Sequence, residues 1–554
     1  MRIGIFVLLT ISLFGSMAYA QDDFSIPADN WTYGVIQQLQ NRGYLLDLSP
    51  GFKPYRRIDV AKALENLESQ SDLSKIPPAD GWLIRKLEDE FAPDLQILTT
   101  KRSNADTSFV GARFSEEAFA NVAKGDYQTF KYAGKVEFRP LVRTGFGFNI
   151  GNHLTLYTDA TVNQTLKDDT LYTGSTKFGL DALHRQAYIR YSGPHFDFTF
   201  GRDYLSWGYG NNGTVLISTT PGAFDMASLL INTKVMKFNW FVAQLNQMPE
   251  FTPDTNNYGV YGPGPTAGRP DPMAIRYFTG SRWEFNIADK VFLGAYQAAT
   301  FGGLNAPIDL ELINPLRLTY ETEVNSNGLE RPNAFLGLDF SIFYPRDFDF
   351  YGDLMIDDWQ VDHKTIGDLK PSLYAFDLGF HAANIFSSLG LSGTDVNLQY
   401  MMVRNRVYNH YNWTSFMKLL LNNYPIANPY GDDFWSLDLR LSHWLSYGWK
   451  LGLEAMHIEH GSQNLYGPYT MPWLTDPNIT VATGYNEPFP YGTVQSTNLI
   501  QATAMYQPEH YLYGQATLIY SRNHNYDYSL GLNKALFSFL FTIYYNFSTS
   551  IPFK

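Results

Sequence analysis

The sequence predicts a mainly-β fold: a large antiparallel transmembrane β-barrel with a small N-terminal helical domain. Three observations support this prediction: an N-terminus typical of exported proteins, period-two alternation over most of the chain, and an unusual composition. Of the 554 residues, 16% are aromatic and only 17% are charged. This balance suits strands that present one aromatic-rich face to lipid and one polar face to water.

The N-terminus has the pattern of a secretory signal peptide over residues 1–20. Arg2 precedes an apolar run at residues 3–14, and Ala-Tyr-Ala at residues 18–20 forms a cleavage pattern before Gln21. The run is shorter than the ~20 residues that a spanning helix needs, which disfavours a retained membrane anchor. The sequence after Gln21 contains no long uninterrupted apolar segment, so we expect any membrane crossing to use strands.

Residues 21–95 are expected to form a periplasmic helical domain. Asn30 is expected to cap a first helix at residues 31–42. Two further helices are expected at about residues 57–67 and 81–91, because apolar side chains recur there at helical spacing.

This segment also combines a helix end, a Phe-x-Pro loop and an Arg-x-Asp-x-Ala helix start. The pattern comprises Asn30, Trp31, Val35, Ile36, Leu39, Arg42, Gly43, Tyr44, Phe52, Lys53, Pro54, Arg57, Ile58, Asp59, Val60 and Ala61. It resembles one copy of the S-layer-homology module. The resemblance implies that residues 21–95 bind a cell-wall polymer such as peptidoglycan. A helical cap packed on the barrel is the equal alternative.

From about residue 100 to residue 554 the pattern changes to period two, as on a strand. At residues 537–547 the odd-numbered positions are all Phe, Ile or Tyr. Residues 435–442, 196–200 and 186–191 also alternate and keep their charges on one face. Because a lipid-facing charge costs about 2–4 kcal/mol at mid-membrane, that face is expected to line the lumen. The predicted lumen-lining residues are Arg190, Asp197, Asp438 and Arg440.

At about 25 residues per strand and loop, this region corresponds to about 18 strands, within a range of about 16–20. Segments rich in Gly, Pro and Asn at residues 252–272, 325–333 and 461–492 are expected to be external loops, with short periplasmic turns at the other end. A soluble, secreted β-rich enzyme acting on glycosides is a less favoured alternative.

Composition excludes several classes of function. The formal net charge is −13 without a long basic run, which argues against a nucleic-acid partner. The absence of cysteine excludes disulfides, thiolate catalysis and Cys-ligated metals. Residues 208–213 match a G-x-G-x-x-G pattern, but a strand-like run at 214–218 follows where a nucleotide site needs a helix.

Two other groups of polar residues are not expected to carry chemistry. On a strand, His457 and Glu459 would share a face while His460 points away, so we expect no metal site. The adjacent pairs at residues 357–358 and 432–433 would also face opposite ways, unlike a glycosidase carboxylate pair. We therefore expect no catalysis, cofactor or metal.

Residues 201–211 combine charged, aromatic and glycine residues in one short stretch. Aromatic faces stack on sugar rings, while Arg, Asp and Asn bond to hydroxyl groups. The candidate glycan-binding residues are Arg202, Asp203, Tyr204, Trp207, Tyr209 and Asn211. The alternative is a loop that folds back and packs in the lumen.

The same stretch reads Gly-Arg-x-x-x-x-Trp-Gly at residues 201–208 and Gly-Thr-Val-Leu-Ile-Ser at residues 213–218. Together with residues 311–315 and 351–358, it resembles the Wzi-type capsule-assembly family. The resemblance implies an outer-membrane barrel with a periplasmic helical plug. Such a protein acts as a lectin that helps to hold capsular polysaccharide on the cell surface, and is not an enzyme.

The predicted function is therefore binding of surface polysaccharide in capsule or exopolysaccharide assembly or attachment. The predicted location is the bacterial outer membrane, with membrane lipid and the polysaccharide as partners. The alternative is a porin or carbohydrate channel that its N-terminal helical module tethers to the cell wall. Whether that module plugs the barrel or binds the wall separates the two functions.

Overall fold

The computed structural model describes most of the chain. The described residues are 24–70, 76–103, 110–125, 137–151, 153–163, 174–177, 180–249, 273–321, 332–390, 392–411, 416–445 and 448–553. The predicted signal peptide, the predicted loop at 252–272 and most of the loop at 325–333 lie outside them.

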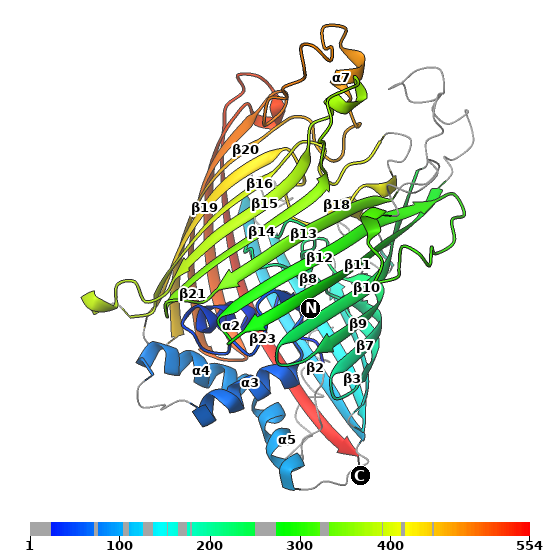
Figure 1. Ribbon diagram of the computed structural model, residues 1–554. Helices are drawn as coiled ribbons and strands as arrows, with labels where there is room; N and C mark the ends of the chain where they lie inside the picture. The colour runs from blue at the N-terminus through cyan, green and yellow to red at the C-terminus, as the bar shows by residue number, and fades with distance from the viewer. Residues whose placement is uncertain are drawn as a thin grey trace.

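Within these residues, eighteen antiparallel strands close into a barrel, which confirms the predicted fold (Figure 1). Strands pair with their chain neighbours, and the last strand closes the barrel on the first, from Val110 opposite Phe553 to Gly125 opposite Ser538. The short strands β5 and β6 both pair with β4 and count as one. The barrel strands are β2 (Val110–Gly125), β3 (Glu137–Ile150), β4 (Leu154–Asn163), β5 (Asp181–Leu183), β6 (Ala187–Ser192), β7 (Phe196–Asp203), β9 (Phe224–Asn232), β10 (Met236–Pro249), β11 (Met273–Ile287), β12 (Val291–Gly303), β13 (Asn333–Ile342), β14 (Phe348–Asp358), β15 (Leu373–Ala382), β16 (Thr394–Val403), β19 (Phe434–Trp444), β20 (Trp449–His460), β21 (Gln495–Glu509), β22 (Leu512–His524) and β23 (Lys534–Phe553).

Alternation along each strand separates an outer apolar face from an inner polar face. In β23, Phe537 is 54% exposed while the next residue, Ser538, is buried. In β19, Leu437 and Leu439 are exposed while Asp438 between them is buried. The exposed side chains form the apolar outer band that a bilayer requires, and the polar ones point into the barrel.

Four helices precede the barrel: α2 (Thr32–Asn41), α3 (Arg57–Gln70), α4 (Pro78–Glu90) and α5 (Ala92–Ser103). The first three lie where helices were expected, and Asn30 accepts a hydrogen bond from the Thr32 amide at its Oδ1 (3.0 Å). Helix α5 was not expected, because its apolar residues show only weak helical periodicity. Among the described residues, no helix is both long and apolar enough to cross a membrane.

The two ends of the barrel differ. At one end short turns join the strands, for example at residues 233–235 and 288–290, and the helices and the C-terminus lie there (Figure 1). At the other end the connections are long, and their described parts include residues 304–321, 404–411, 416–433 and 461–494, the last of which carries α7 (Pro472–Thr475). Short turns on one side and long loops on the other are typical of outer-membrane barrels.

Candidate functional site

The helical segment is bound to the barrel wall through a buried arginine. Arg42, at the end of α2, is fully buried and lies 2.7 Å from a carboxylate oxygen of Asp80 in α4. Its second terminal nitrogen lies 2.7 Å from Asp395 in barrel strand β16. One guanidinium group therefore joins two helices to the barrel, in a bidentate geometry that lysine cannot reproduce.

Further polar contacts surround the entry of the chain into the barrel. Arg56 lies 2.7 Å from Asp197 of β7, and Asp29 lies 3.0 Å from Arg143 of β3. The Ser25 hydroxyl donates a hydrogen bond to Asp203 (2.7 Å), which also lies 3.2 Å from Arg190. The predicted lumen residues Arg190 and Asp197 thus lie buried against the N-terminal segment.

The segment between β7 and β9 folds into the barrel and meets the N-terminal segment. A short strand, β8 (Ser206–Trp207), pairs with β1 (Phe52–Lys53). Trp207 is 1% exposed, and its indole N–H donates a hydrogen bond to Asn239 Oδ1 on the barrel wall (3.0 Å). The Phe-x-Pro loop of the helical segment therefore ends as part of a small sheet inside the barrel.

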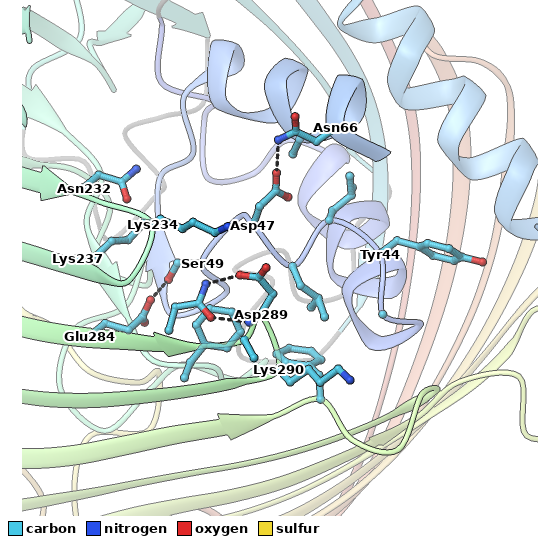
Figure 2. A pocket seen from close by; sticks show the side chains of 18 of the residues that line it. Tyr44, Asp47, Ser49, Asn66, Asn232, Lys234, Lys237, Glu284, Asp289 and Lys290 are labelled. Atoms are coloured by element: carbon cyan, nitrogen blue, oxygen red, sulfur yellow. Dashed lines mark hydrogen bonds between the residues drawn. The ribbon is translucent and has the colours of Figure 1, made fainter. Parts of the chain in front are cut away.

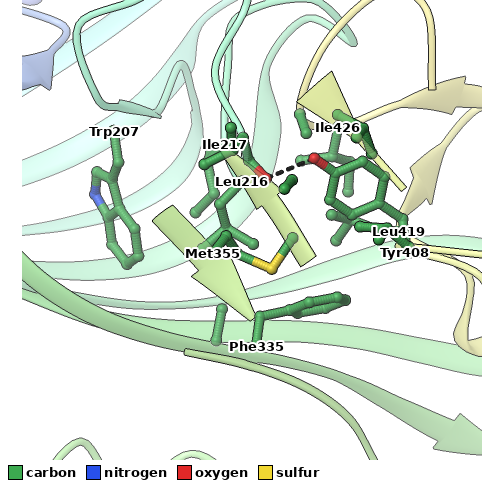
Figure 3. Close-up of a cluster of buried hydrophobic side chains, with 14 of the residues drawn as sticks. Trp207, Leu216, Ile217, Phe335, Met355, Tyr408, Leu419 and Ile426 are labelled. Atoms are coloured by element: carbon green, nitrogen blue, oxygen red, sulfur yellow. Dashed lines mark hydrogen bonds between the residues drawn. The ribbon is translucent and has the colours of Figure 1, made fainter. Parts of the chain in front are cut away.

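Beyond Trp207, the same inward segment forms an apolar plug with residues 404–411 and 416–433. Val215, Leu216 and Ile217 are 0–1% exposed. Tyr408 donates a hydrogen bond from its hydroxyl to the Val215 carbonyl oxygen (2.7 Å). Figure 3 shows Leu216 and Ile217 packed beside Tyr408 and Met355. The apolar cluster around them includes lumen-facing side chains from β9 round to β22, among them Phe241, Phe335, Met355, Met401, Phe434, Met456 and Ile519.

Backbone contact between the two inward segments is close. Gly213 has a φ of +92°, and a Cβ added there would lie 2.8 Å from the Cα of Asn428. The next amide, that of Thr214, donates a hydrogen bond to the Ala427 carbonyl (2.9 Å). Glycine is required here both for its left-handed backbone and for this approach.

The six predicted glycan-binding residues lie within or beside this inward segment. Asp203, Tyr204, Trp207 and Tyr209 are buried, so stacking of these three rings on a sugar would require the segment to move. Arg202 and Asn211 are half-buried. The segment packs in the lumen, as the alternative interpretation held, and glycan contact by these residues stays a prediction.

Arg202 and Asn211 have protein partners of their own. Arg202 pairs with Asp225 at the start of β9. Asn211 accepts a hydrogen bond from Gln37 of α2 (3.0 Å). Both residues thus link the inward segment to its surroundings while keeping part of their surface accessible.

The other two predicted lumen residues contact the tip of the inward segment. Asp438 accepts a hydrogen bond from the Asn212 side-chain Nδ2 (2.6 Å) and lies 2.9 Å from Arg440 Nε. Arg440 also lies 3.2 Å from Glu454 on the neighbouring strand. Asp438 and Arg440 are thus held by ion pairs and hydrogen bonds with the inward segment and the barrel wall.

A compact cap covers the long-loop end, and sequence reasoning missed its centre. Arg406 is 2% exposed; its Nε donates to the Thr470 carbonyl (2.7 Å), and its guanidinium pairs with Glu487. The same group lies 5.1 Å from the Trp473 ring centre. The aromatic content of the predicted 461–492 loop was the available signal, but the partner at residue 406 is distant in sequence.

The adjacent carboxylates Asp432 and Asp433 anchor the base of this cap. Asp432 accepts a hydrogen bond from the Arg406 amide (3.0 Å), and Asp433 accepts one from the Tyr491 amide (2.9 Å). Burial raises the pKa of Asp432 to about 7 and the pKa of Asp433 to about 9. The two groups hold separate loops.

The histidines considered as metal ligands have other partners. His460 bonds through Nδ1 to the Tyr528 hydroxyl, and His457 lies 2.9 Å from the Asn498 side chain. Within the described ranges, no three His, Asp or Glu side chains are placed to share a metal ion.

Residues 106–536 match the family model described as capsule assembly protein Wzi. The fold is similar to that of the Escherichia coli outer-membrane protein Wzi, whose structure is described as a carbohydrate-binding β-barrel involved in group 1 capsule assembly. The TM-score is 0.53 at 15% identity, over 94% of this chain and 98% of that one. Pseudomonas aeruginosa OccD3 (TM-score 0.42, 11% identity, 79% and 91% coverage) and OprD (0.43, 11%, 79% and 94%) are less similar. No curated protein sequence matches the chain.

Proposed function

The chain belongs to the Wzi capsule-assembly family, and from this premise we propose that it binds surface polysaccharide and helps to assemble or attach a capsule or exopolysaccharide layer. In this proposal the long-loop end faces outward from the outer membrane, and the helical segment closes the periplasmic end of the barrel. The family assignment favours a binding barrel over an enzyme.

The observation that carries the proposal is the filled lumen. A conducting channel needs a continuous polar path, whereas the apolar cluster joins wall residues from β9 round to β22 with side chains of two inward segments. The helical segment fills the other end through Arg42, Arg56 and Asp29. This arrangement supports a surface-binding protein more than a porin.

The proposed binding surface is the cap formed by the 404–433 and 461–494 loops. Its core is preorganised by Arg406, Trp473 and Glu487, so ordering it on binding would cost little entropy. Tyr466 is 58% exposed at its surface and offers a ring face on which a sugar can stack.

The test is binding of capsular polysaccharide, purified from the bacterium that carries the gene, to the full chain in detergent micelles. We expect Tyr466→Ala to weaken binding roughly threefold to tenfold, the loss of one stacking contact. Tyr511→Ala, which removes an exposed tyrosine from a turn at the opposite end, should leave binding unchanged.

Planar-bilayer recordings of the same preparation test the alternative. The proposal expects negligible ion conductance from the wild-type protein. Absence of polysaccharide binding together with steady conductance would instead favour a carbohydrate channel. Co-sedimentation with peptidoglycan then tests whether the helical segment also contacts the cell wall.

A further inference from the structure

A large cleft at the helical end of the barrel has no role in the proposed surface binding. Its volume is about 980 Å³, and it lies between the helical segment and the barrel turns at residues 233–235, 288–290 and 343–347 (Figure 2). Pockets of about 300–1,000 Å³ are typical of ligand sites, so this cleft can hold several sugar units.

The barrel supplies four cationic side chains to this cleft: Lys234, Lys237, Lys290 and Arg346. Lys234 extends from its turn across the cleft towards the helical segment, as Figure 2 shows. Among the ion pairs of the described residues, none includes one of these four side chains.

Two carboxylates of the cleft accept hydrogen bonds from neutral amides and keep their negative charge, and the third is paired with an arginine. Asp47 accepts a hydrogen bond from Asn66 (3.1 Å), and Asp289 accepts one from Asn286 (2.7 Å). Glu284 lies 2.9 Å from the buried Arg282. Arg346 donates hydrogen bonds to the Arg42 carbonyl oxygen and the Tyr44 hydroxyl, and Lys237 lies opposite Glu284 in the β10–β11 pairing. The exposed Lys234 and Lys290 are therefore the charges placed to meet a ligand, in a chain whose net charge is −13.

Aromatic and amide groups accompany these cations. Lys290 lies 5.7 Å from the ring centre of Tyr344, which is 70% exposed. Tyr44 is buried, and the Arg346 guanidinium lies 5.0 Å from its ring centre, so Tyr344 supplies the accessible ring. Asn232 also lines the cleft. Ring faces stack on sugars, amides bond to hydroxyls, and cations pair with carboxylates.

We propose that this cleft binds a carboxylate-bearing glycan. The site needs both parts of the molecule, since the cations come from the barrel and the facing wall, with Asp47 and Asn66, comes from the helical segment. The isolated residues 21–95 would therefore lack it. Two glycans share this chemistry, the peptidoglycan of the cell wall and an acidic capsular polymer before it reaches the surface.

The test titrates the full chain in detergent micelles with hexagalacturonate, with maltohexaose as the neutral control. We expect hexagalacturonate to bind in a salt-sensitive manner and the Lys234→Glu/Lys290→Glu variant to lose at least about tenfold in affinity, which corresponds to one strong charge contact. Both lysines are exposed on turns. Unchanged heat-modifiable migration in gels would verify that the barrel is intact.

Lys364→Glu makes the same charge change on an exposed lysine of the 359–372 loop at the opposite end, and its affinity should equal that of the wild type. Equal binding of maltohexaose, equal competition by inorganic phosphate, or an unaffected double variant would overturn the proposal. Separate assays with intact peptidoglycan sacculi and with purified capsular polymer identify which glycan is the source. None of these results depends on Tyr466.

Discussion

Two structures occupy the barrel lumen, the N-terminal helical segment at one end and the apolar plug nearer the long loops, and their contacts with the wall differ in chemistry. At the helical end, the contacts between helices and wall combine ion pairs around Arg42 with an apolar contact in which Trp82 of α4 packs on Trp444 of β19, with ring centres 5.0 Å apart. Towards the loop end, the plug is an apolar cluster around Leu216 in which the polar groups are mainly backbone. Buried ion pairs give geometric specificity but lose heavily when one partner is removed, whereas apolar packing loses in proportion to the volume deleted. Loss of a single ion-pair partner should therefore affect the helical segment more than loss of a single apolar side chain affects the apolar plug.

The largest expected effect comes from Arg42→Met. Removing the guanidinium leaves the buried Asp80 carboxylate without its counter-charge and cuts the link to Asp395, at a cost of about 3–5 kcal/mol. We expect the helical segment to detach before the barrel unfolds, seen as faster protease cleavage within residues 24–103. The cleavage rate of Arg42→Lys should lie between those of the wild type and Arg42→Met, because lysine keeps the positive charge but cannot bond to two carboxylates as the planar guanidinium does.

The stability loss of Arg42→Met should depend on pH through Asp80. Burial raises the pKa of Asp80 to about 6, although Arg42 opposes the shift. Because this pKa lies above its ordinary value of 3.8, the contribution of Asp80 to stability is full below about pH 4 and is lost as pH rises through about 6. The deficit of Arg42→Met should thus be smaller at pH 5 than at pH 8. An equal deficit at both values would show that Asp395 carries the effect.

Leu216→Ala tests the apolar plug. The residue is 1% exposed, so truncation should cost about 3 kcal/mol through lost burial and the cavity left behind. The loss in urea unfolding should not depend on salt or pH, unlike that of Arg42→Met. Leu310→Ala, at a position 73% exposed on a loop at the same end, should change stability by less than about 0.5 kcal/mol.

Trp207→Phe tests the junction between the helical segment and the apolar plug. This substitution removes the indole N–H that donates a hydrogen bond to Asn239 Oδ1. The buried oxygen loses that partner, at a cost of about 1.5 kcal/mol. Because β8 pairs with β1, protease cleavage of the helical segment should also increase slightly. The lipid-facing Trp449→Phe is the matched control; an effect as large as that of Trp207→Phe would contradict the assigned junction.

The smallest effect is expected from Asp197→Asn. Asp197 is buried, but asparagine can still accept a hydrogen bond there, and Arg56 keeps a second contact with Asp59 at 2.7 Å, so the loss should be about 1 kcal/mol. Raising the salt concentration should reduce the difference from wild type in protease cleavage. A loss as large as that of Arg42→Met would show that the helical segment is held evenly around the rim.

The candidate site was only partly predictable. The stretch at residues 201–211 was recognisable from its mixture of Arg, Trp, Tyr and Gly, and both an exposed and an inward-packed loop were open to it. Its burial depends on residues 404–433, since Tyr408 bonds to Val215 across 193 positions. The cap was equally hard to predict, because the ion pair between Arg406 and Glu487 joins residues that are 81 positions apart.

The sequence by itself determined the barrel, its approximate strand number and the first three helices, because these depend on local periodicity: side chains alternate between lipid and lumen along a strand and recur every three to four residues on a helix. The contents of the lumen were decided only by the tertiary structure. Arg42 and Asp395 are separated by 353 positions, and no local pattern records that pairing. The cleft lined by Lys234 and Lys290 likewise exists only because closure of the barrel places separate turns beside the helical segment.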